Sequence, residues 1–392
     1  ISSHRWDGFQ KDADMPQRSL PGWKDRILFT PGPLTTSQTV KQAMLRDLGS
    51  RDTAFIGLVA DIRQRLVSLA GASTSEYTTV PIQGSGTFGV EAVISSAVPP
   101  TGKILVVVNG AYGKRIVQMV KVHRIEHLVY EVPENQSPSP AEIDKIVSAD
   151  PAITTIAIVH CETTTGMINP IEAVGSIARK QGKRLVVDAM SSFGAVPIDV
   201  PSIGIDYIVS SANKCIEGVP GFSFAVCRLA ALQETKGWAR TLSLDLFAQW
   251  QGLEATKQFR FTPPTHTMLA FHQALMELEM EGGIAARAAR YRRNHDVLLA
   301  GMTRLGFLPY LPPEQQGYII TSFRSPTHPR YDFETFYRLL NDRGYVIYPG
   351  KVSDADCFRI GHIGRILEGD VRDLLAAIDD VMDEMKLDLV KR

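Results

Sequence analysis

The amino-acid sequence predicts an α/β fold in which a large domain with a mostly parallel seven-stranded sheet precedes a smaller C-terminal α/β domain. Between about residues 55 and 230, short runs rich in β-branched residues alternate with segments of helical period. This alternation is typical of βα units, whose helices cover both faces of parallel strands. The seven runs are YTTVPI, KILVVVN, HLVYEV, ITTIAIVH, KRLVVDAM, DYIVSS and FSFAVCR.

The smaller domain is predicted from a second series of elements. A long helical pattern covers residues 265–306 and is broken at Gly282 and Gly283. The strand-like runs GYIITSF, YVIYP and DCFRIGHI then alternate with the helical patterns DFETFYRLLNDRG and EGDVRDLLAAIDDVMDEMKL. We therefore expect a polar N-terminal extension over residues 1–26, a large domain with its N-terminal segment over 27–268, and a small domain over 269–392.

Composition favours a small-molecule partner. The 392 residues are 44% hydrophobic, and 42 lysines and arginines balance 42 aspartates and glutamates. Because no long run of like charge occurs and no apolar run approaches about 18 residues, we predict neither a nucleic-acid nor a membrane partner. The four cysteines lack CxxC spacing, which argues against a disulfide framework and favours a cytoplasmic protein. His123 and His127 have no third ligand nearby, so we predict no metal site.

Two ionisable residues follow neighbouring strands of the predicted sheet. Asp188 ends the run RLVVDAM, and Lys214 lies just after the run DYIVSS, in the segment SSANKCIEGVPGF. Since the carboxyl ends of parallel strands meet at one edge of a sheet, we expect the acid and the amine to face one cleft. Taken alone, the pair is equally compatible with a structural salt bridge.

Three further motifs lie at the ends of other strands. Gly84-Ser85-Gly86-Thr87 separates a strand from a helix whose free N–H groups suit a phosphate, although a plain turn with a helix cap often has the same pattern. HCETTTG supplies hydroxyl groups that include that of Thr163, and NGAYGKR supplies the ring of Tyr112. Together with a lysine and an acid, these groups predict a pocket for pyridoxal 5′-phosphate.

Ten segments in register identify the chain as similar to a known family. They are LFTPGPLTTS, QGSGTFGVEAV, NGAYGKR, HCETTTGMINPI, VDAMSSFG, SSANKCIEGVPGF, LSLDLFAQW, RFTPPTHT, VIYPGKVS and CFRIGHIG. In this order they resemble the 2-aminoethylphosphonate:pyruvate aminotransferases, which are class V aminotransferases with the type I fold of pyridoxal phosphate-dependent enzymes. The resemblance covers about residues 27–385. It implies transamination between 2-aminoethylphosphonate and pyruvate, which gives phosphonoacetaldehyde and alanine.

The resemblance also implies how the cofactor is held. Lys214 would bind it covalently and move the reacting proton, and Asp188 would keep the pyridine nitrogen protonated. Thr163 would hydrogen-bond the ring hydroxyl, and Tyr112 would lie over the ring face. The phosphate would be held by Ser85, Gly86 and Thr87, with Thr262 contributed by a second subunit. A homodimer with shared active sites follows from this role of Thr262.

Substrate recognition is expected at a guanidinium group and at an N-terminal loop. Arg359 would bind the anionic end of both substrates as a bidentate donor, and Thr30, Pro31 and Gly32 would complete the substrate site. The chain departs from the family pattern at Arg51, where tryptophan is common, and at Glu217, where glutamine is usual. Other class V activities therefore stay open, such as alanine or serine:glyoxylate transamination or the use of a modified aminophosphonate.

Overall fold

The large sheet has the predicted composition and direction. The computed structural model describes residues 25–349 and 355–389, and in this part of the chain seven strands pair in the order β2-β10-β9-β8-β5-β3-β4. β10 is antiparallel to β2 and to β9, and the remaining neighbours are parallel. Each predicted run overlaps one strand, so the predicted fold class is confirmed. The strands are β2 (Tyr77–Gln83), β3 (Lys103–Val108), β4 (Glu126–Glu131), β5 (Ile153–Val159), β8 (Arg184–Asp188), β9 (Tyr207–Ser211) and β10 (Phe222–Arg228).

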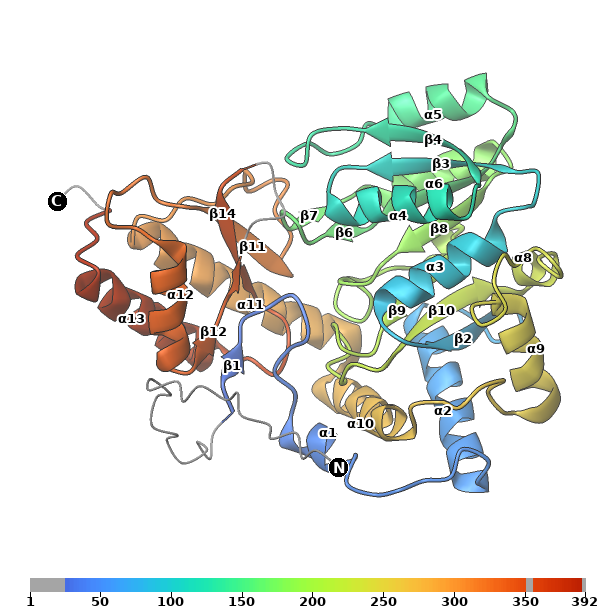
Figure 1. Cartoon of the computed structure of the whole chain (residues 1–392), viewed down its shortest axis with the longest axis horizontal. Coiled ribbons are helices and arrows are strands. Elements are labelled where there is room, and N and C mark those ends of the chain that lie inside the picture. Colours follow the sequence, from blue (N-terminus) through green and yellow to red (C-terminus); the bar gives the residue numbers. More distant parts are fainter. Residues whose placement is uncertain (1–24, 350–354, 390–392) are drawn as a thin grey trace, which may run out of the picture.

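Helices cover both faces of this sheet, as parallel strands require (Figure 1). Successive residues of β3 illustrate the division, since Leu105 and Val107 pack into one apolar core while Ile104 and Val106 pack into the other. One core takes side chains from α3 (Gly86–Ala97), α4 (Ala111–Val122), α8 (Leu229–Gln233) and α9 (Leu246–Thr256). The other takes them from α1 (Gln38–Gln42), α2 (Thr53–Leu69), α5 (Pro140–Ala149), α6 (Ile171–Lys180), α7 (Val200–Ile203) and α10 (Thr265–Glu281). We call this part the large body.

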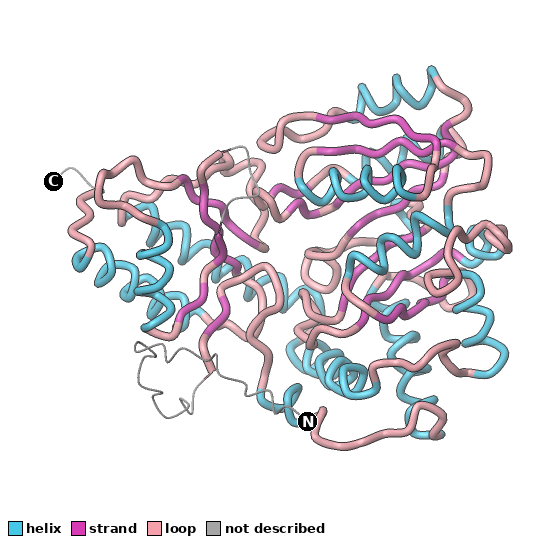
Figure 2. The backbone as a smooth tube through the Cα atoms, in the orientation of Figure 1, coloured by secondary structure: helices cyan, strands magenta, loops and turns pink. Residues whose placement is uncertain are grey.

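The C-terminal part forms a small body around an antiparallel sheet. This sheet consists of β11 (Ile320–Arg324), β14 (Cys357–Gly361) and β13 (Tyr348–Pro349). It packs with α11 (Gly283–Arg304), α12 (Phe333–Asp342) and α13 (Glu368–Glu384) around a third apolar core, in which the ring of Phe358 touches four other phenylalanine rings. Figure 2 shows these strands in magenta with cyan helices beside them. The arrangement agrees with the predicted α/β character of this part.

The N-terminal segment packs against the small body. β1 (Ile27–Leu28) pairs in parallel with β12 (Tyr345–Val346), and Phe29 is buried in the third core. The predicted boundary near residue 268 falls within α10, and residues 1–24 of the predicted extension lie outside the described residues. The proposed domain limits thus stay a prediction. A short hairpin, β6 (Cys161–Glu162) with β7 (Met167–Ile168), follows β5.

Among the helices of the described residues, none combines the length and the apolar character that crossing a bilayer needs.

Candidate active site

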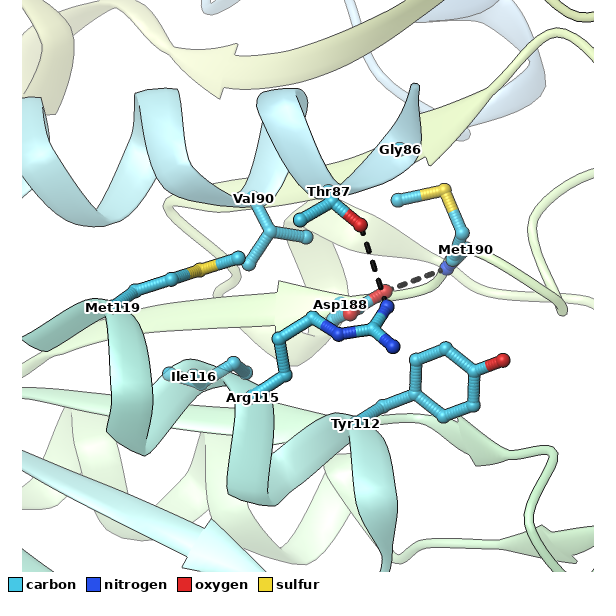
Figure 3. A pocket seen from close by; sticks show the side chains of 9 residues that line it. All are labelled: Gly86, Thr87, Val90, Tyr112, Arg115, Ile116, Met119, Asp188 and Met190. Carbon is cyan, nitrogen blue, oxygen red and sulfur yellow. Dashed lines mark hydrogen bonds between the residues drawn. The ribbon is translucent and has the colours of Figure 1, made fainter. Parts of the chain in front are cut away.

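A pocket lies where several strands of the large sheet end. α3 contributes Gly86 and Thr87, α4 contributes Tyr112, and the end of β8 contributes Asp188 (Figure 3). Val90, Arg115, Ile116, Met119 and Met190 complete the lining. Four residues predicted from three motifs therefore share one cavity. The reason is topological, since α3 follows β2, α4 follows β3 and Asp188 ends β8, and these strands run in the same direction.

Lys214 lies three residues beyond the end of β9, in a partly buried turn. Its Nζ donates a hydrogen bond to the carbonyl oxygen of Pro31 at 2.6 Å. Burial lowers the pKa of the Lys214 amine to about 8, although the charge of Asp188 acts in the opposite direction. The amine therefore loses its proton much closer to neutral pH than an exposed lysine does.

Asp188 is 5% exposed, and its Oδ1 accepts a hydrogen bond from the backbone N–H of Met190 at 2.9 Å. Burial raises the pKa of the Asp188 carboxyl group to about 6, while that hydrogen bond and the charge of Lys214 oppose the shift. The acid and the amine thus influence one another electrostatically at one edge of the sheet, although Lys214 is not among the residues that line the pocket. Neither is a solvated strand end.

The first turn of α3 offers donors to an anion. Ser85 occupies the N-cap position of α3, but within the described residues its hydroxyl accepts no capping hydrogen bond from the helix backbone. The first N–H groups of the helix are therefore available to a ligand. Gly86 packs so closely against Met190 that a Cβ atom would collide with its sulfur. Ser85 itself is exposed and is not one of the residues that line the pocket.

Two residues that sequence reasoning missed contact Tyr112, Arg115 at its ring and Glu162 at its backbone. Arg115 places its guanidinium carbon 5.0 Å from the centre of that ring and donates from Nη1 to Thr87 Oγ1 at 3.3 Å (Figure 3). Glu162 accepts from the backbone N–H groups of Tyr112 at 3.2 Å and Gly113 at 3.4 Å, and so caps α4. Burial raises the pKa of Glu162 to about 7. The i, i+3 spacing of Tyr112 and Arg115 was the available signal for the arginine.

Thr163 and Arg359 are joined across the two bodies. Arg359 Nη1 donates to the carbonyl oxygen of Thr163 at 2.9 Å, and Nη2 donates to that of Pro349 at 3.0 Å. Burial lowers the pKa of the Arg359 guanidinium, which is 2% exposed. Among the described residues, neither Arg359 Nε nor the buried hydroxyl of Thr163 has a hydrogen-bond partner. Both atoms are thus ready-made donors for a ligand.

The predicted N-terminal loop touches the lysine. The carbonyl oxygen of Pro31 accepts a hydrogen bond from Lys214 Nζ. The next residue, Gly32, has φ +112°, and a Cβ atom there would lie 2.9 Å from the same nitrogen. Thr30 is buried, and its backbone lies so close to Gly361 that a side chain at that glycine would collide with it. The loop therefore lies between the lysine and the strand that carries Arg359.

Thr262 and Arg51 are surface residues. Thr262 is exposed, and its carbonyl oxygen accepts from Gln83 Nε2 at 3.3 Å. Arg51 is exposed beside Asp52, the N-cap residue of α2. Within the described chain, neither lines the pocket.

Comparison with known proteins assigns the fold and the chemistry to a family. The family model described as aminotransferase class-V matches residues 35–353. The chain belongs to the class V aminotransferases. This class V aminotransferase is 53% identical to the 2-aminoethylphosphonate–pyruvate transaminase of Klebsiella pneumoniae over 92% of this chain and 98% of that protein. It is equally similar, at 53% with the same coverage, to the enzyme of that name from Salmonella typhimurium.

Solved structures place the class V aminotransferase among proteins of the same fold. Pyridoxamine-pyruvate aminotransferase from Mesorhizobium loti is 26% identical, with a TM-score of 0.85, and the match covers 94% of this chain and 95% of that one. Ureidoglycine-glyoxylate aminotransferase from Bacillus subtilis also reaches a TM-score of 0.85, at 22% identity and with coverage of 92% and 94%. The predicted type I fold is therefore confirmed.

The raised pKa of Asp188 predicts a pH-dependent effect of its substitution on stability. Between pH 4 and 6 the folded protein binds the Asp188 proton more tightly than the unfolded chain does, so this group's contribution to the free energy of unfolding falls as the pH rises. In protein freed of cofactor, Asp188→Asn should therefore be more stable than the wild type at pH 8, by up to about 3 kcal/mol. The gain should shrink toward pH 4, as measured by denaturant unfolding.

Asp379→Asn, at an exposed position of α13, is the control and should leave the pH profile unchanged. If Asp188→Asn is less stable than the wild type, and by the same amount at pH 8 as at pH 4.5, then burial of the Asp188 charge does not have the expected cost.

Proposed function

We propose that the protein is a pyridoxal 5′-phosphate-dependent transaminase that transfers the amino group of 2-aminoethylphosphonate to pyruvate, forming phosphonoacetaldehyde and alanine. The observation that carries the proposal is the burial of Lys214 and Asp188 at one edge of the large sheet, with the buried Arg359 of β14 hydrogen-bonded to the carbonyl oxygen of Thr163. The 53% identity to transaminases named for these two substrates supports the choice of substrates. The scattered cysteines favour the cytoplasm as its location.

The residues present fit the cofactor. The unpartnered buried hydroxyl of Thr163 suits the ring hydroxyl, the uncapped first turn of α3 suits a phosphate, and Asp188 suits a protonated ring nitrogen. Tyr112 presents an aromatic face to the same pocket. When bound, pyridoxal phosphate supplies a ring that withdraws electrons from the carbon bearing the amino group.

Lys214 moves the proton in this proposal. Because its pKa is about 8, a substantial fraction of the amine is neutral at mildly alkaline pH and can accept a proton from the reacting carbon. Asp188, ionised above pH 6, holds the proton on the ring nitrogen. In the protein without ligand, the Pro31 carbonyl oxygen accepts a hydrogen bond from Lys214 Nζ and so orients the amine.

Arg359 orients both substrates. Within the described part of the chain, its Nε has no hydrogen-bond partner, and its Nη1 and Nη2 donate to backbone carbonyl oxygens at 2.9 and 3.0 Å. No carboxylate of these residues is therefore hydrogen-bonded to the guanidinium group. A phosphonate or a carboxylate would supply that group with two parallel hydrogen bonds. One cationic group thereby serves two half-reactions.

We also place Thr262 of a second subunit at the phosphate. Thr262 and Phe261 are exposed, and Gln83, next to the Gly84-Ser85 turn, holds their backbone carbonyl groups through its side-chain amide. This surface lies beside the first turn of α3, where a partner would meet the phosphate. The active form is accordingly a homodimer with shared sites.

The central experiment is a panel of amines and keto acids assayed with the purified protein and pyridoxal phosphate. We expect a visible absorbance band and the highest kcat/KM for 2-aminoethylphosphonate with pyruvate. Lys214→Ala should bind the cofactor without covalent attachment and lose turnover by roughly a thousandfold or more. A higher kcat/KM for alanine or serine with glyoxylate would refute the substrate assignment, and a wild type that gives no visible band with excess cofactor would refute the cofactor.

Thr163→Val tests the proposed contact with the ring hydroxyl. Removing an unpartnered buried hydroxyl should not lower the stability of the cofactor-free protein, because no hydrogen bond is lost. Cofactor affinity should fall about fivefold, the scale of one neutral hydrogen bond of ~1 kcal/mol. Thr165→Val is a matched control, since the Thr165 hydroxyl is also buried and unpartnered among the described residues, and this variant should keep the wild-type affinity. Equal affinities for both variants, measured by fluorescence titration, would argue against the contact.

Arg359→Lys tests the shared anion site. An ammonium group keeps the charge but loses the bidentate geometry, so both half-reactions should lose roughly 2–4 kcal/mol of transition-state stabilisation. Single-turnover kinetics with the amine and with the keto acid measure the two losses separately. A defect confined to pyruvate would show that another group binds the phosphonate.

A further inference from the structure

A buried cluster of charged residues lies beside the turn that carries Lys214. We call it the Glu217 cluster; its members are Glu217, Glu281, Arg287, Arg290 and Tyr291. Glu217 is 4% exposed, and its Oε1 accepts from the Tyr291 hydroxyl at 2.6 Å and from Arg290 Nη2 at 2.7 Å. The same oxygen lies 3.5 Å from Arg287 Nη1. One carboxylate thus meets three side chains of α11.

The backbone at Glu217 is held in a costly conformation. Its φ of +66° lies in the left-handed region, which costs a residue with a side chain roughly 1–2 kcal/mol. Its N–H donates to the Lys214 carbonyl at 2.7 Å, and the N–H of Gly218 donates to the Ala212 carbonyl at 2.9 Å. Residues 212–218 therefore close into a compact turn around Lys214. The contacts of the Glu217 side chain offset the cost of this turn.

Helix α11 also holds the two segments that carry the proposed catalytic lysine and substrate arginine. Arg287 Nη1 donates to the carbonyl oxygen of Cys215, the residue after Lys214, at 2.6 Å. Arg290 Nη1 donates to the Gly364 carbonyl at 2.6 Å, and the Tyr291 hydroxyl accepts from the Gly364 N–H at 3.1 Å. Gly364 lies three residues beyond the end of β14, the strand of Arg359. One helix thereby connects the turn of the large body to a strand of the small body (Figure 1).

The charges of the cluster balance. Glu281 Oε2 lies 2.7 Å from Arg287 Nε and its Oε1 lies 2.7 Å from Arg290 Nε, so two carboxylates face two guanidinium groups. Burial opposes the charge of Arg290, but the hydrogen bond with Glu281 and the charge of Glu217 raise its pKa overall. Removal of either carboxylate would leave an unpaired positive charge away from water, which is strongly destabilising. The two carboxylates differ in position, because Glu217 belongs to the Lys214 turn whereas Glu281 ends α10.

We propose that Glu217 is a positioning residue that, through α11, fixes the Lys214 amine relative to the Arg359 guanidinium. This inference rests on the proposed function, in which the amine meets the reacting carbon and the guanidinium meets the anionic end of the same substrate. A displacement of about 1 Å between such groups is enough to lower a rate about a hundredfold. Glu217 does not line the pocket, and its carboxylate contacts side chains of α11.

Three variants separate positioning from stability. Glu217→Gly accepts the positive φ but deletes the contacts, and Glu217→Gln keeps an acceptor but removes the charge. Glu281→Gln is the matched control, because it removes the same charge from the same cluster at a residue that does not belong to the Lys214 turn. For each variant with bound cofactor we would measure the midpoint pH of the visible absorbance band without substrate, kcat and KM for each half-reaction, and Tm.

We expect Glu217→Gly to lower kcat roughly 10- to 100-fold in both half-reactions and to shift the midpoint pH by about half a unit or more. Glu217→Gln should show smaller changes in the same direction. Glu281→Gln should lower Tm but keep kcat within about twofold and the midpoint pH of the wild type. If Glu217→Gly does not fold, the midpoint shift in Glu217→Gln compared with Glu281→Gln decides the question.

Two outcomes would overturn the inference for different reasons. If the Glu217 variants and Glu281→Gln lower Tm alike while the midpoint pH and kcat stay at wild-type values, the cluster only stabilises the fold. Equal midpoint shifts in Glu217→Gln and Glu281→Gln would show a general effect of charge and would also refute positioning. A wild type without any visible band or turnover would instead refute the proposed function, and it is recognised before any variant is made.

Discussion

The active-site region depends on keeping three charged side chains away from water. Burial lowers the pKa of Lys214 and Arg359 and raises that of Asp188, so each group is held where its charged form is disfavoured. The charges of Lys214 and Asp188 offset one another in part, and carbonyl oxygens of Pro31 and Thr163 accept from the two cations. The lysine and the arginine are thus satisfied chiefly by backbone from other segments of the chain.

Those segments must approach one another closely, and glycine makes this possible. At Gly32 the positive φ and the short distance to Lys214 exclude a side chain, and at Gly361 the backbone of Thr30 occupies the space of a Cβ atom. The N-terminal loop is thereby held between the lysine turn and the strand of Arg359. A site of this type tolerates little variation in backbone position, even at residues that carry no chemistry.

Local patterns in the sequence were enough to predict the large sheet and part of the site. The β-branched runs of the strands and the strand-end positions of Asp188 and Lys214 are local signals, and the topology turns them into a shared edge. The capping of α4 by Glu162 and the cluster around Glu217 could not be predicted in this way, because each joins residues about 50 to 75 positions apart. The resemblance to a family supplied Arg359 and Thr262. The role of Thr262 in a second subunit is part of the proposed function.

The pairing of β1 with β12 also has a consequence for biosynthesis. Ile27 and Leu28 are translated long before their partners Tyr345 and Val346. The strand pairing next to the loop that supplies the Pro31 carbonyl to Lys214 therefore cannot form until Tyr345 and Val346 have been made, even if the seven-stranded sheet has already formed. Because contacts between residues so far apart in sequence form more slowly than local ones, we expect the N-terminal loop to join the site after the large sheet has folded.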